Sequence, residues 1–163
     1  MTHHPQHELV FTYGTLKRGF PNHPLMEEWN AAFIAEATTL RTYPLIVAGP
    51  WNVPFLFDAP DHPQGHHVEG ELFTVDAAGL QALDRFEGVD RDYYARVSID
   101  VRVRTADGND RPATAWCYVR SGQMPEGLDD PARFLRSYGA AEVATYVPVD
   151  SRPADWTNDT DCL

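Results

Sequence analysis

The spacing of apolar positions along the chain predicts more strands than helices. Apolar and polar residues alternate with a period of two in segments 97–103 and 113–119, which is typical of strands that bury one face. The polar stretch 106–110 between them predicts a hairpin turn. Apolar runs bounded by Gly, Pro or Asp predict further strands at 8–13, 33–43, 53–57 and 68–75, with the second of them leading into the apolar run 44–49.

The same pattern predicts a small number of helices. Asp76 is placed to cap a helix that ends at Gly88. Pro24 suits the first turn of a short helix that continues to Trp29, and a last short helix is predicted over 131–138. Because strands dominate, we predict an α+β fold, a small, mostly antiparallel β-barrel with a few flanking helices, in which closure protects the strand edges.

The length and charge of the chain set its expected organisation. A chain of 163 residues favours one domain, here 8–150, with a flexible N-terminal tail over 1–7 and an acidic, poorly ordered tail over 151–163. The net charge of −11 repels phosphate backbones and anionic lipids, so neither nucleic acid nor a membrane is expected as a partner. The sequence lacks a secretion signal and a spanning apolar run, which favours the cytoplasm. It makes no prediction of oligomeric state.

One acidic residue at the end of the helix predicted after Asp76 falls on its apolar face. At about 100° per residue, Glu87 lies between the core-facing Leu80 and Leu83. A carboxylate there needs a partner, a cavity or a proton. Two interpretations stay open: Glu87 frays toward solvent or pairs with Arg91 or Arg96, or it lies in a partly dry pocket that raises its pKa above the reference of about 4.3.

A glycine loop follows the first predicted strand. Residues 14–19 have the G-x-x-x-x-G spacing of a phosphate-binding loop, but Phe20 and Pro21 stand where Lys and Ser or Thr are required, which excludes that mechanism. A glycine directly after a strand still lets backbone N–H groups converge on an anion such as a carboxylate or an oxyanion. The alternative is an ordinary turn.

Segment 10–19, with the sequence Val-Phe-Thr-Tyr-Gly-Thr-Leu-Lys-Arg-Gly, resembles the opening strand and loop of the γ-glutamylcyclotransferase-like superfamily. Within it, the chain is most similar to the γ-glutamylamine cyclotransferases. The resemblance implies a small barrel with flanking helices and one essential acid, Glu87, at the end of a Leu-Asp-x-Phe-Glu motif. Further matching segments lie at 21–23, 43–49, 68–72, 83–87 and 94–96, and the implied substrate-binding residues are Tyr13, Gly14, Thr15, Leu16 and Tyr94.

The resemblance also implies an activity: release of 5-oxoproline and a free amine from a γ-glutamylamine such as γ-glutamyl-ε-lysine, without cofactor or metal. The substrate's α-amine attacks its own γ-carbonyl, so Glu87 has only to take a proton and return it to the leaving nitrogen. Backbone N–H groups at 14–16 are expected to bind the α-carboxylate or the developing oxyanion. The alternatives are another γ-glutamyl amide, such as a γ-glutamyl-amino acid, and a non-catalytic ligand-binding module on the same barrel.

Two other enzyme classes fit the sequence less well. A metal-dependent hydrolase would use His62, His66 and His67, but these lie in or beside a proline-rich loop, whereas zinc ligands prefer rigid elements. We therefore expect no metal. A cysteine enzyme would use Cys117, whose apolar neighbours on the same strand face indicate a core position.

Overall fold

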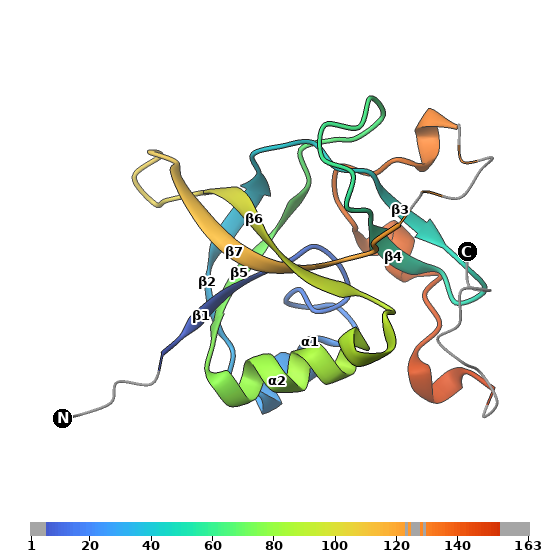
Figure 1. Ribbon diagram of the computed structural model, residues 1–163, viewed down its shortest axis with the longest axis horizontal. Helices are drawn as coiled ribbons and strands as arrows, with labels where there is room; N and C mark the ends of the chain where they lie inside the picture. Colours follow the sequence, from blue (N-terminus) through green and yellow to red (C-terminus); the bar gives the residue numbers. More distant parts are fainter. Residues whose placement is uncertain (1–5, 123, 125–127, 129, 154–163) are drawn as a thin grey trace.

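The computed structural model describes residues 6–122, 124, 128 and 130–153, and five of its strands close into a barrel in the order β1-β5-β2-β6-β7 (Figure 1). Neighbouring strands are antiparallel except at the closure, where Val10 of β1 pairs in parallel with Trp116 of β7. The predicted α+β barrel is confirmed, with one parallel pair in it. The barrel strands are β1 (Glu8–Thr12), β2 (Ala32–Thr39), β5 (Glu69–Val75), β6 (Ala95–Val103) and β7 (Arg111–Val119).

A separate hairpin of β3 (Leu45–Ala48) and β4 (Val53–Leu56) lies beside the barrel (Figure 1). The prediction of one strand over 33–43 is wrong at its end, because β2 stops at Thr39. There the Thr39 hydroxyl donates to the carbonyl of Arg41 at 2.6 Å, and the chain turns. The apolar run 44–49 therefore contributes a strand of a second sheet.

Helix α2 (Ala77–Phe86) carries the candidate acid to the barrel, and its predicted ends are confirmed. The Asp76 carboxylate accepts a hydrogen bond from the N–H of Gly79 at 2.7 Å, which caps the helix. Gly88 adopts a φ of 66°, a left-handed conformation that ends helices and favours glycine. Leu83 is fully buried against the barrel core, so the last turn of α2 is fixed over one end of the barrel (Figure 1).

The other helices are short. The helix predicted near Pro24 is α1 (His23–Glu28), which lies near α2 below the barrel in Figure 1. Short 3-10 turns follow at η1 (Val89–Arg91), η2 (Pro131–Arg133) and η3 (Val149–Ser151). No helix in the described part of the chain has the length and apolar character needed to cross a membrane.

The helix predicted over 131–138 is wrong. Only the turn η2 forms, and from Phe134 the backbone is extended, with φ −87° and ψ 116°. Extension lets the N–H of Leu135 donate to the carbonyl of Leu45 at 2.8 Å, so the segment runs beside β3 while Phe134 is buried. The helix of this region is instead α3 (Ala140–Val143), which the sequence pattern did not indicate.

Candidate active site

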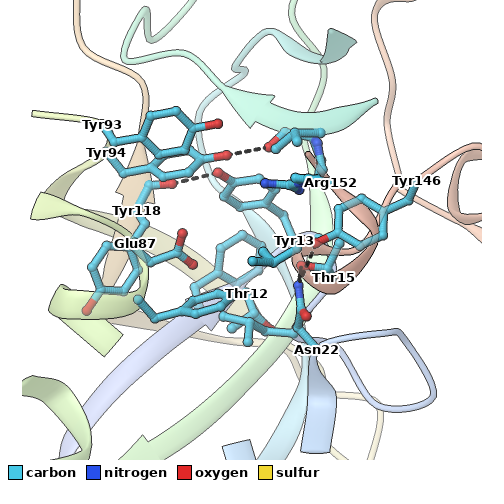
Figure 2. Close-up of a pocket in the computed structure, with 17 residues that line it drawn as sticks. Thr12, Tyr13, Thr15, Asn22, Glu87, Tyr93, Tyr94, Tyr118, Tyr146 and Arg152 are labelled. Carbon is cyan, nitrogen blue, oxygen red and sulfur yellow. Dashed lines mark hydrogen bonds between the residues drawn. The ribbon is translucent and has the colours of Figure 1, made fainter. Parts of the chain in front are cut away.

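The six residues expected to form the site all line one pocket at the end of the barrel (Figure 2). The pocket has a cavity volume of about 90 Å³. Glu87 lies at the end of helix α2, residues 13–16 form the loop after β1, and Tyr94 directly precedes β6. These residues are Tyr13, Gly14, Thr15, Leu16, Glu87 and Tyr94.

Glu87 caps the C-terminus of α2 with its backbone and turns its carboxylate toward the pocket (Figure 2). Neither arginine weighed as its partner takes that place: Arg96 Nε lies 2.9 Å from Asp84, and Arg91 Nε lies 4.0 Å from Asp90. The Glu87 carboxylate forms no ion pair with any described residue. The pairing interpretation is therefore wrong for this side chain, and the pocket interpretation describes it.

The surroundings of Glu87 favour its protonated form. Burial among aromatic side chains raises the pKa of Glu87 to about 8. Desolvation is the cause of this shift, and none of the described ion pairs of the protein includes Glu87. A carboxyl group with a pKa in this range exchanges protons readily near neutral pH, as a general acid–base residue must.

The loop after β1 offers backbone donors to the same pocket. The N–H groups of Gly14, Thr15 and Leu16 donate to no described residue, whereas the carbonyls of Gly14 and Thr15 accept from Lys17 and Asn22. Gly14 is needed here for space, because a Cβ at this position would lie 2.9 Å from Cγ of Pro54. Three adjacent N–H groups on a turn of this kind suit an anion.

The hydroxyl groups of the two predicted tyrosines both donate hydrogen bonds to backbone carbonyls of the protein. Tyr13 donates to the carbonyl of Tyr118 at 2.6 Å, and Tyr94 donates to the carbonyl of Pro54 at 2.8 Å (Figure 2). Burial raises the pKa of both phenols well above the usual value, so neither ionises in the working range. Their rings therefore line the pocket. The hydroxyl group of Tyr13 holds the end of β1 against β7, and that of Tyr94 holds the segment before β6 against β4.

A hydrogen-bonded group joins α2 to the barrel beneath the pocket. The Asp84 carboxylate accepts from the hydroxyl of Tyr118 at 2.7 Å and pairs with Arg96, which lies over the ring of Trp116. Tyr118 lines the pocket, and Asp84 lies one turn before Glu87 on α2. The group thus fixes the helix turn that carries the acid, while Arg96 neutralises Asp84.

Sequence reasoning missed six polar or charged lining residues: Thr12, Asn22, Tyr93, Tyr118, Tyr146 and Arg152. Asn22 follows the glycine loop in the Pro-Asn-His segment, which was a usable signal. Tyr118 alternates with the core residues Cys117 and Val119 on β7, so the period-two pattern of this strand gave no reason to predict that Tyr118 lines the pocket. Arg152 lies beyond the expected domain boundary at 150, and no motif marks the C-terminal part of the chain.

Asn22 connects two walls of the pocket. Its Nδ2 donates to the Thr15 hydroxyl at 2.9 Å and to the Tyr146 hydroxyl at 3.0 Å (Figure 2). Asn22→Ala removes both bonds, and we expect the free energy of unfolding to fall by about 1–2 kcal/mol in urea denaturation. Gln81→Ala, on the exposed face of α2, is the control and leaves it unchanged. Equal stability of the two variants would contradict this function of Asn22.

The residues of the two rival sites lie elsewhere. His62 stacks on Phe134 at 5.9 Å between ring centroids, and His67 Nδ1 lies 3.0 Å from the carbonyl of Thr39. Among the described residues, no three His, Cys, Asp or Glu side chains are grouped to hold a metal ion. Cys117 is fully buried in the barrel, and burial raises the pKa of its thiol, as expected for a core residue.

Two curated proteins illustrate the sequence similarity of the chain. It is 50% identical over 95 residues to the Arabidopsis thaliana protein "Putative gamma-glutamylcyclotransferase", a match that covers 56% of this chain and 49% of that protein. It is 40% identical over 120 residues to the human gamma-glutamylaminecyclotransferase, covering 69% of this chain and 77% of that protein. The match thus spans about half the length of the plant relative.

A solved structure and a family model agree with these matches. The crystal structure of an AIG2-like protein from Mus musculus superposes with a TM-score of 0.78 at 34% identity, covering 90% of this chain and 99% of that one. The family model described as gamma-glutamyl cyclotransferase, AIG2-like, matches residues 10–135, which contain the end of β1, the glycine loop and α2. The chain therefore belongs to the AIG2-like γ-glutamyl cyclotransferase family.

Proposed function

We propose that this protein is a γ-glutamyl cyclotransferase that converts a γ-glutamylamine, such as γ-glutamyl-ε-lysine, into 5-oxoproline and a free amine. One observation carries the proposal: a carboxyl group with a pKa of about 8 shares a pocket with three backbone N–H groups that have no described acceptor. Membership of the family supports the reaction type. Relatives named as amine cyclotransferases support the choice of substrate.

The reaction needs little from the protein beyond position and proton transfer. The deprotonated Glu87 takes a proton from the substrate's α-ammonium, and the freed nitrogen attacks the γ-carbonyl carbon to close a five-membered ring. The bond from that carbon to the leaving nitrogen then breaks as Glu87 returns the proton to this nitrogen. The ring nitrogen still carries a second proton that it must lose, and Glu87 takes it and passes it to the released amine, which departs as an ammonium ion. Proton and bond changes balance without water, so the products are the lactam and the amine.

The loop after β1 supplies the electrostatic part of the proposal. Its N–H groups at Gly14, Thr15 and Leu16 bind either the substrate's α-carboxylate or the oxygen that gains charge during attack. The apolar and aromatic walls around Glu87 exclude water, which strengthens both interactions and raises the basicity of the carboxylate.

The test is a product assay with purified protein and two substrates, γ-glutamyl-ε-lysine and γ-glutamyl-alanine. We expect 5-oxoproline by mass spectrometry, with a higher kcat/KM for the ε-lysine amide. Faster turnover of γ-glutamyl-alanine would reassign the substrate to γ-glutamyl-amino acids. Free glutamate in place of 5-oxoproline would mean that water is the nucleophile, and absence of both products with a folded protein would favour a binding module.

A further inference from the structure

Asn22 donates hydrogen bonds to two hydroxyl groups at the pocket, those of Thr15 and Tyr146. Its Nδ2 lies 2.9 Å from Thr15 Oγ1 and 3.0 Å from the Tyr146 hydroxyl oxygen (Figure 2). A side-chain amide nitrogen only donates, so both hydroxyl oxygens are acceptors in these bonds and each keeps its own proton for a further group. Neither hydroxyl donates to another group among the residues that the structure describes.

Tyr146 reaches the pocket from a C-terminal segment that is held on both sides of this residue. The N–H of Val147 donates to the carbonyl of Trp51 at 3.0 Å, and Asn52 Nδ2 donates to the carbonyl of Thr145 at 2.8 Å. Both partners lie in the turn between β3 and β4. The Tyr146 hydroxyl therefore has a fixed position at the pocket, although the residue is far from the glycine loop in the sequence.

The two hydroxyl protons add to the hydrogen-bond donors of the loop after β1. The N–H groups of Gly14, Thr15 and Leu16 also donate to no described residue. Figure 2 shows the hydroxyl groups of Thr15 and Tyr146 together on one side of the cavity and the Glu87 carboxylate on the other. A group of donors of this kind suits an anion. The α-carboxylate is the anionic group that every γ-glutamyl amide carries.

We propose that the hydroxyl groups of Tyr146 and Thr15 bind the α-carboxylate of the substrate, and that Asn22 orients both hydroxyls for this contact. This rests on the proposed function, which supplies the substrate. The α-ammonium faces Glu87, which takes its proton, so the α-carboxylate on the same carbon faces the opposite side of the cavity. Hydrogen bonds to a charged acceptor are stronger than those between neutral groups. Recognition of the glutamyl part thus includes a residue beyond segment 10–135, which the family model matches.

Two hexyl amides test this contact because they differ only in the α-carboxylate: γ-glutamyl-hexylamine and 4-aminobutanoyl-hexylamine. They cyclise to 5-oxoproline and to 2-pyrrolidinone, and both release hexylamine, which mass spectrometry measures. Tyr146→Phe keeps the ring and removes the hydroxyl. We expect it to lower kcat/KM for the γ-glutamyl amide by about tenfold, through a higher KM at an unchanged kcat. The value for the aminobutanoyl amide should change by no more than about twofold, because this amide has no carboxylate to lose.

Two further variants separate this contact from a structural effect. The matched control is Tyr138→Phe, whose hydroxyl is buried without a hydrogen-bond partner in the described part of the chain, outside the described pocket lining. It should leave both kcat/KM values within about twofold of the wild type. Asn22→Asp replaces the donor by a carboxylate that only accepts, so both hydroxyl protons turn toward it. This variant should lower kcat/KM for the γ-glutamyl amide by about 100-fold and that for the aminobutanoyl amide by less than about tenfold.

Equal effects on the two amides decide against the proposal. If Tyr146→Phe lowers kcat/KM for both amides by the same factor, or for neither, the Tyr146 hydroxyl does not contact the α-carboxylate. If Asn22→Asp lowers both by the same factor, Asn22 does not orient the hydroxyl groups for this contact.

Binding to a protein without turnover separates this inference from the proposed function. In the Glu87→Gln background, calorimetry measures Kd for both hexyl amides. The added Tyr146→Phe change should weaken binding of the γ-glutamyl amide by about tenfold and that of the aminobutanoyl amide by no more than about twofold. If the wild type releases no hexylamine but this difference appears, the reaction is wrong and the subsite stands. Equal weakening of both amides, unchanged binding of the γ-glutamyl amide, or its failure to bind overturns the subsite whatever the wild type produces.

Discussion

Glu87→Gln is expected to reduce kcat/KM for 5-oxoproline formation by about 10³-fold, the range typical of losing a general acid–base group. Gln matches Glu in shape, so the pocket keeps its walls, but the amide neither takes the proton from the α-ammonium nor returns one to the leaving nitrogen. No other acidic residue among those described lines the pocket, so no neighbour can take over either transfer. Steady-state assays by mass spectrometry measure the loss.

The matched control is Glu28→Gln, which makes the same change at an exposed position on α1. It should leave kcat/KM within about twofold of the wild type, as surface substitutions usually do. Substrate binding to Glu87→Gln, followed by calorimetry, should persist, because the loop N–H groups are unchanged. Retention of full turnover in Glu87→Gln would contradict the proposed chemistry and move the acid–base function away from α2.

The position of Glu87 illustrates what the sequence made predictable. Helical periodicity placed the carboxylate between two core-facing leucines, and the Asp76 cap and Gly88 stop fixed the ends of the helix. Periodicity did not decide whether the Glu87 carboxylate has an ionic partner, because Arg91 and Arg96 both follow it closely in the sequence. In the structure, Arg96 pairs with Asp84, which also accepts a hydrogen bond from the Tyr118 hydroxyl. The Glu87 carboxylate therefore lies in the pocket without Arg96 as its partner.

The parts that could not be predicted depend on contacts between distant segments. Residues 134–136 follow β3 and β5 because their backbone N–H and carbonyl groups find partners at Leu45 and Glu69, and no local pattern records those partners. Arg152 reaches the pocket because Val147 bonds to Trp51, about a hundred residues earlier in the chain. The polar composition after 150 predicted a tail over 151–163, of which residues 154–163 lie outside the described residues. In the described part, Arg152 donates to the carbonyl of Val147, a hydrogen bond that composition does not record.

Protonation of Glu87 should also make the stability of the protein depend on pH. In the unfolded chain this carboxyl group titrates near its reference pKa of about 4.3. In the folded protein its pKa is about 8, so between these values the folded state holds a proton that the unfolded state has released. Stability therefore falls as pH rises through this window, and the cost is absent below it and complete above it.

Gln does not ionise, so Glu87→Gln should remove this cost. The stability of the variant relative to the wild type should rise by about 3–4 kcal/mol between pH 5 and pH 9, the size that a pKa change from about 4.3 to about 8 implies. Urea denaturation at both pH values measures it, and contributions from other groups cancel in the difference. Glu28→Gln should show the same stability difference from the wild type at both pH values. If Glu87→Gln behaves in the same way, Glu87 titrates as a solvated carboxyl group, and the pocket does not supply the environment that the proposed proton transfers require.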